Sequence, residues 1–171
     1  MASVMAKGAA RPVRALHADA YEKLLAIGAI ALFVTILVAL AKGYAQWTAV
    51  PAVIWGHVAT VLVALALTPP MLLRPRGDKT HRLVGKVWVA AMFLTAAESF
   101  LVQFSHPGHF SFIHIISAYV VVAAPLIWWT AHTHRVAAHR RQVRGMVTGA
   151  LLIAGFFTLP PFRLLGHWLI S

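Results

Sequence analysis

Ten histidines are the residues of this 171-residue chain best suited to chemistry. Two of them lie inside apolar stretches, with His57 six residues after Pro51 and His114 four residues after Phe110. At about 1.5 Å of helix rise per residue, both imidazoles are expected within roughly 10 Å of the same end of their helices. An imidazole in such surroundings needs a polar partner, and each is the natural partner of the other.

Two neutral imidazoles facing each other from separate helices suit axial ligation of haem iron, with a four-helix core as the surrounding sleeve. Gly56 beside His57 and Ser117 beside His114 would leave room for a macrocycle. The alternative is a hydrogen bond between helices, which stabilises a membrane bundle by about 0.6–2 kcal/mol and needs no cofactor. We expect one haem b at this outer pair, and a second haem could bind at another pair of histidines.

The second haem would use His81 and His139, which are both expected on the cytoplasmic side, across the membrane from His57 and His114. Each is followed by an arginine, Arg82 and Arg140, that could pair with haem propionates, as Arg163 could at the outer site. A basic rim that binds anionic lipid is the commoner explanation of such residues. Both interpretations of the inner pair stay open.

Glu98 is the one acidic residue within an apolar stretch away from its ends. The preferred interpretation is a charge partner for Arg163. Glu98 could also complete a mononuclear metal site with His57 and His114, since two histidines and a carboxylate suit iron or zinc. A third alternative is a proton carrier, because burial favours the protonated carboxyl.

Composition determines the class of protein that positions these residues. Hydrophobic residues make up 60% of the chain and charged residues 11%, and the mean hydropathy is +0.77. These values indicate a polytopic helical membrane protein. The absence of cysteine excludes disulfides, thiolate metal sites and iron–sulfur clusters. The net charge of +11 is explained by basic cytoplasmic loops, not by nucleic-acid binding.

The predicted architecture is all-α, with a basic cytoplasmic tail over residues 1–20 and a single transmembrane domain over 21–171. Five spans are expected, at about 24–41, 51–73, 81–103, 110–131 and 144–165. Spans two to five would form a four-helix core, with the first span at its side. Thirteen Lys and Arg residues fall on one side of this topology and two on the other. The asymmetry predicts a cytoplasmic N-terminus and an external C-terminus.

Several short strings resemble an uncharacterised bacterial family of multi-span membrane proteins, catalogued as a domain of unknown function. They are His57, His81-Arg82-x-x-Gly85, Ser111-Phe-Ile-His114-Ile-Ile-Ser117, His139-Arg140, and Gly155 to Gly166 with its Pro-Pro-Phe-Arg163 centre. The resemblance covers roughly residues 50 to 167, and Glu98 departs from it, because a small residue is expected there. It implies a bacterial cytoplasmic membrane protein and supplies no activity.

The placement of the histidines more loosely resembles cytochrome b561-type proteins. In that family one haem lies between the second and fourth helices of a helical core and another between the third and fifth. The resemblance pairs His57 with His114 and His81 with His139. The residues around them do not otherwise look like that family.

The function predicted from these features is a b-type-cytochrome-like protein that transfers electrons in or across the membrane. One alternative is a cofactor-free subunit or scaffold that packs against a larger membrane complex or binds lipid. Another is a small proton-coupled transporter that uses Glu98 and the histidines. The expected partners are the lipid bilayer with its anionic lipids and a larger complex or a second copy of the chain.

Overall fold

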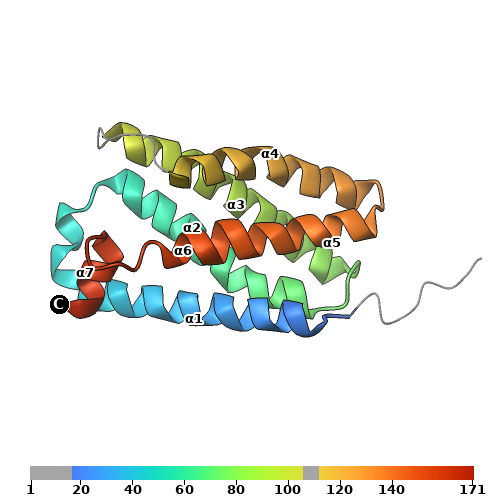
Figure 1. Ribbon diagram of the computed structural model, residues 1–171, viewed down its shortest axis with the longest axis horizontal. Helices are drawn as coiled ribbons and strands as arrows, with labels where there is room; N and C mark the ends of the chain where they lie inside the picture. Colours follow the sequence, from blue (N-terminus) through green and yellow to red (C-terminus); the bar gives the residue numbers. More distant parts are fainter. Residues whose placement is uncertain (1–16, 106–111) are drawn as a thin grey trace, which may run out of the picture.

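The computed structural model describes residues 17–105 and 112–171, and within them the chain is helical with no strand. Figure 1 shows the long helices lying side by side as one bundle. In chain order the elements are α1 (Ala20–Lys42), η2 (Tyr44–Ala49), α2 (Ala52–Leu73), α3 (Lys79–Ser105), α4 (Phe112–His132), α5 (Val136–Gly145), η3 (Met146–Ile153), α6 (Ala154–Phe156) and α7 (Leu164–Ile170). Most of the predicted 1–20 tail lies outside the described residues.

Four of the helices are long and apolar enough to cross a membrane. They are α1, α2, α3 between Lys79 and Val102, and α4 between His114 and His132. This confirms the all-α class and the first four predicted spans as apolar helices. Pro69 and Pro70 do not interrupt α2, which continues to Leu73 and ends where Arg74 adopts an extended conformation. The residue before a proline is disfavoured in the helical region, and Pro75 follows Arg74.

The stretch predicted as the fifth span, 144–165, is not one regular helix. The helical turns of α5, η3 and α6 follow one another from Val136 to Phe156, and η3 is a π-helix. The chain then turns through Pro160 and Pro161 before α7 begins at Leu164. Proline lacks the N–H that a helix interior requires, and its ring clashes with the preceding turn. The predicted helix therefore ends nine residues early.

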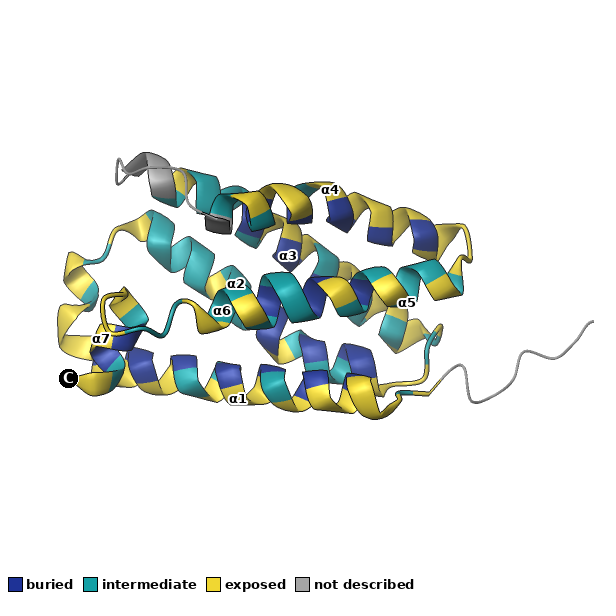
Figure 2. Ribbon diagram, in the orientation of Figure 1, coloured by how far each residue is buried: buried dark blue, intermediate teal, exposed yellow. Residues whose placement is uncertain are grey.

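The bundle is closed by the α5–η3–α6 stretch, which Figure 1 shows crossing between α1 and α4. Figure 2 shows buried residues on the facing sides of the helices and exposed residues on their outer sides. On α1, Ala29 and Ala39 are fully buried, whereas Leu24 and Ile27 are each 63% exposed. Exposed apolar side chains of this kind suit contact with lipid. Helix α1 thus packs as a member of the bundle, in contrast to the expected peripheral span.

The backbone of α6 closely approaches a side chain of α1. A Cβ atom on Gly155 of α6 would lie 2.5 Å from a methyl group of Leu32 on α1, so a larger residue there would require the Leu32 side chain to shift. Beyond it, Trp168 of α7 is buried, and its Nε1 donates to Oε1 of Gln46 at 2.9 Å. These contacts hold the C-terminal segment against α1 and η2.

Candidate functional site

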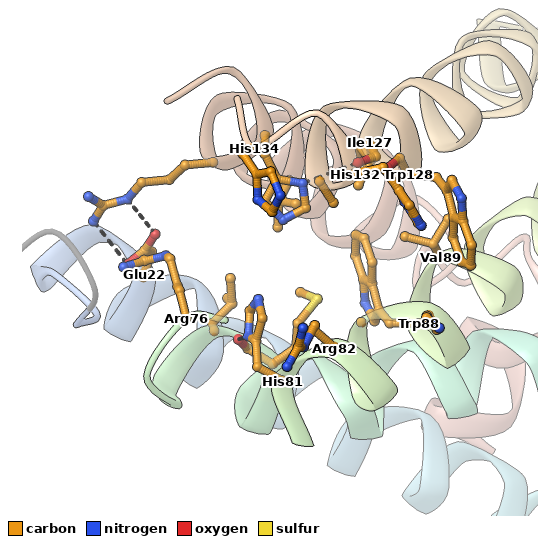
Figure 3. A pocket seen from close by; sticks show the side chains of 18 residues that line it. Glu22, Arg76, His81, Arg82, Trp88, Val89, Ile127, Trp128, His132 and His134 are labelled. Carbon is orange, nitrogen blue, oxygen red and sulfur yellow. Dashed lines mark hydrogen bonds and ion pairs between the residues drawn. The ribbon is translucent and has the colours of Figure 1, made fainter. Parts of the chain in front are cut away.

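A cavity of about 380 Å³ lies at the end of the bundle where α1 begins. Its walls come from the end of α2, the first turns of α3, the end of α4 and the first turns of α5. Figure 3 shows two facing walls, with His81, Arg82 and Trp88 on one and Trp128, His132 and His134 on the other. We call this space the basic pocket. Its volume falls in the range of ordinary ligand sites, about 300–1,000 Å³.

The histidines of the predicted inner pair, His81 and His139, both line the basic pocket. Nδ1 of His81 lies 3.2 Å from the carbonyl oxygen of Met71, and Nδ1 of His139 lies 3.2 Å from that of Ile127. A carbonyl oxygen only accepts, so each Nδ1 carries the hydrogen and donates it. The lone pair of each neutral ring is then on Nε2, which has no hydrogen-bond partner within the described residues.

This is how metal-ligating histidines are usually prepared, since a backbone carbonyl fixes the tautomer and the ring orientation. The two imidazoles are close enough to interact electrostatically. Burial lowers the pKa of His139, the bond to the Ile127 carbonyl opposes that shift, and the positive charge of Arg76 adds to it. The neutral ring, the form that binds metals, is therefore favoured at His139.

The face of α3 toward the pocket leaves open space in its middle. His81, Gly85 and Trp88 recur at helical spacing on that face. A Cβ atom placed on Gly85 would meet nothing within 4 Å. Arg82 and Lys86 flank this gap, and the Lys86 ammonium lies 5.6 Å from the Trp128 ring centroid. The gap suits a flat group whose acidic substituents lie near the two cations.

Glu22 of α1 forms the acidic edge of the basic pocket and is only 1% exposed. Its carboxylate accepts from Arg140 at 2.8 Å, from Arg144 at 3.2 Å and from Arg76. Glu22 also shares a capping box with Asp19, the N-cap residue of α1. The network joins α1, the turn after α2, and α5, and it neutralises part of the pocket's positive charge.

Glu22 was not among the residues singled out from the sequence, although two signals mark it. Asp19 and Glu22 have capping-box spacing directly before an apolar run. They are also two of only four acidic residues against fifteen basic ones. Arg140, expected to face a propionate, bonds to both acids instead.

The predicted outer pair is arranged differently. Nδ1 of His57 donates to the carbonyl oxygen of Thr95 at 3.1 Å, and His57 lines a second cavity of about 140 Å³. That volume is below the ordinary range for ligand pockets. His114 is not among the residues that line this cavity, and its ring centroid lies 6.1 Å from that of Phe100. Among the described residues, His57 is therefore the member of the predicted outer pair that lines this cavity.

Glu98 pairs with a hydroxyl group, not with Arg163. Its Oε2 accepts from Thr60 at 2.7 Å, and the ion pairs among the described residues involve Asp19, Glu22 and Asp78. Arg163 is exposed at the start of α7, 5.7 Å from the Phe162 ring centroid. Within the described part of the chain, no three His, Asp or Glu residues are grouped as a metal site. Glu98, His57 and His114 form no such group among the described residues.

No protein-family model, curated protein or solved structure matches this chain.

Proposed function

We propose that this protein is a membrane-embedded b-type haem protein that carries electrons, and that its haem lies in the basic pocket between His81 and His139. The main support for the proposal is that the two imidazoles are held in the same tautomer by equivalent hydrogen bonds. Both donate from Nδ1 to a carbonyl oxygen, and both leave Nε2 without a partner among the described residues. Two such nitrogens in one pocket would serve as the two side-chain ligands of a haem iron.

The other pocket residues fit the same group. The open space over Gly85 admits a flat macrocycle beside α3, and Trp88 and Trp128 supply apolar walls. Arg82 and Lys86 lie on the exposed side, where they would hold the propionates. When bound, haem supplies reversible one-electron transfer, while the chain supplies the ligands, the low-dielectric surroundings and the positive charge.

This proposal moves the preferred haem from the outer to the inner pair. The cavity at His57 is smaller than the basic pocket, and His114 does not line it. The proposal keeps the cytoplasmic-membrane location, with the basic pocket on the cytoplasmic side as the excess of Lys and Arg predicts. In this proposal the apolar residues after Arg144, in η3 and α6, cross the membrane as the fifth span.

The test is a dithionite-reduced minus oxidised absorption spectrum of protein purified in detergent after expression with haem available. Sharp α and Soret bands of low-spin haem are expected in the wild type. His81→Ala and His139→Ala should lose those bands, whereas His132→Ala and His134→Ala, which change neighbouring pocket histidines, should keep them. Loss of the bands only in His57→Ala and His114→Ala would return the haem to the outer pair.

A colourless wild-type protein would remove the proposal altogether. The leading account would then be a cofactor-free membrane subunit in which the basic pocket binds an anionic lipid headgroup.

A further inference from the structure

The second cavity, at His57, has a polar wall inside an apolar bundle. His57, Thr95, Ser99, Ser117 and Thr158 line it together with aliphatic residues from α1, α2, α4, η3 and α7. Among the lining residues His57 is the only one with an ionisable side chain. We call this space the His57 cavity.

Two polar atoms in its wall lack a protein partner. Nδ1 of His57 is used by the Thr95 carbonyl, so the ring's other nitrogen, Nε2, is an acceptor with no donor among the described residues. The hydroxyl oxygen of Thr95 is buried and is likewise without a partner in the part of the chain that the structure describes. A buried polar atom such as Oγ1 of Thr95 is almost always hydrogen-bonded, and ordered water is the usual partner when the protein offers none.

The size of the His57 cavity agrees with water. Its volume of about 140 Å³ holds several molecules, since one takes up about 30 Å³ of liquid. The hydroxyls of Ser99 and Ser117, 2.6 Å apart, add sites for hydrogen bonds on the same wall. Polar side chains that face a bundle interior in a membrane commonly line water-filled spaces.

The cavity is closed on the side toward the basic pocket. Trp88 of α3 lines the basic pocket, and Met92, one turn further along, lines the His57 cavity. Trp88 is fully buried, Met92 is 2% exposed, and Leu65 of α2 is fully buried. These side chains separate the two cavities, and His57, on the second turn of α2, lies nearer the end of the bundle where α2 begins.

We propose that the His57 cavity is a one-sided aqueous inlet, filled with water that connects the His57 imidazole to the membrane side where α2 begins. The carboxylate of Glu98 interacts electrostatically with His57 and accepts from Thr60 beside it. Water in the cavity gives this pair a route for proton exchange with that side alone. The inlet does not depend on haem, so its test is independent of the test of the electron-carrier proposal.

Substituted-cysteine labelling tests the inlet directly, because the chain contains no cysteine. Ser99→Cys changes one atom of a lining residue. Leu94→Cys and Leu101→Cys are the matched controls, since these residues bracket Ser99 on α3 and are 49% and 54% exposed on the outer surface of the bundle. Sealed right-side-out and inside-out vesicles are treated with a membrane-impermeant methanethiosulfonate.

We expect Ser99→Cys to react from the side where α2 begins, at least tenfold faster than either leucine variant, and not from the other side. Equal, slow reaction of all three variants from both sides would show a dry cavity and overturn the inlet. Fast reaction of Ser99→Cys from both sides would show a continuous channel and overturn its one-sidedness. Thr158→Cys, at another lining position, replaces Ser99→Cys if that variant does not accumulate in the membrane.

Discussion

The imidazoles of His81 on α3 and His139 on α5 are held in the same way, each by a 3.2 Å bond from Nδ1 to a backbone carbonyl oxygen near the end of a preceding helix. The carbonyls belong to Met71 of α2 and Ile127 of α4. Two successive helix–turn–helix units therefore present an imidazole to one pocket in the same tautomer. This equivalence distinguishes the inner pair from the outer one, where only His57 lines the cavity.

Acidification is expected to weaken the fold and any ligation at His139 below about pH 6.5. Burial lowers the pKa of His139, and Arg76 lowers it further, against the opposing bond to Ile127. In the unfolded chain His139 has an ordinary pKa of about 6.5, so it binds a proton at a higher pH than in the folded chain. The free energy of unfolding therefore falls as the pH falls from about 6.5 toward the lower pKa of the folded state. The stabilisation is complete above about pH 6.5. Thermal unfolding midpoints across this range should show a shallower slope for His139→Gln.

Asp19 serves as a control, because its effect on stability falls in a separate, lower pH range. The backbone N–H of Glu22 is the main cause that lowers the pKa of Asp19, against partial desolvation and with help from Arg144. Its stabilisation is present above the ordinary value of 3.8 and is lost only as the pH falls below it. Asp19→Asn should thus leave the slope near pH 6 unchanged. A slope unaffected by His139→Gln would contradict the assignment to His139.

The helices could be predicted well from the sequence, because long apolar runs leave few other structures in a membrane. The ends of α1 to α4 fall within a few residues of the predicted spans. The last helix was misjudged because apolar residues continue past Phe156, whereas Pro160 and Pro161 prevent a helix there. The packing of α1 was misjudged because a uniformly apolar helix does not show from its sequence which side is buried.

The site was only partly predictable. Helix rise alone places His81 and His139 at one end of the bundle, and the structure brings both to one pocket. Which pair has space beside it depends on how Trp88, Gly85 and their neighbours pack, and sequence spacing does not report that. The bonds from Arg140 to Glu22 span 118 residues, so no local pattern could pair them.

Removing the charge of Glu22 should be strongly destabilising. Glu22→Gln would leave Arg76, Arg140 and Arg144 facing each other without a buried carboxylate between them. Breaking a buried ion pair in this way costs about 3–5 kcal/mol. The arginine side chains keep 11–26% exposure, so we expect the lower end of that range in denaturant unfolding of the detergent-solubilised protein.

Asp78→Asn is the matched control for Glu22→Gln. The pair of Asp78 with Arg74 is 3.2 Å long, and the side chains are 37% and 45% exposed. An exposed pair of this kind contributes little to stability because solvent screens it, and asparagine still caps a helix start. Similar losses in the two variants would show that Glu22 does not act as a buried counter-charge.

Thr68→Val should destabilise the bundle through Trp88. Nε1 of Trp88 donates to Oγ1 of Thr68 at 2.9 Å, and both residues are fully buried. Valine keeps the shape and leaves the indole N–H without its acceptor, at a cost of about 1–3 kcal/mol. Thr35→Val, whose hydroxyl bonds only to the Ala31 carbonyl of its own helix, should change the unfolding free energy by less than about 0.5 kcal/mol. Equal effects would indicate that Trp88 finds another acceptor.

Gly85→Leu should block the basic pocket without weakening α3. A Cβ atom there meets nothing within 4 Å, so the leucine side chain would enter the space assigned to the macrocycle. Leucine is a better helix former than glycine by roughly 0.5–1 kcal/mol, so helix stability should not fall. We expect most haem absorbance to be lost, and the unfolding midpoint of the variant to be equal to or higher than that of haem-free wild-type protein. Gly149→Leu, where a Cβ also meets nothing within 4 Å but which does not line the pocket, should keep its haem. Full haem occupancy in Gly85→Leu would mean that the macrocycle does not lie against this face of α3.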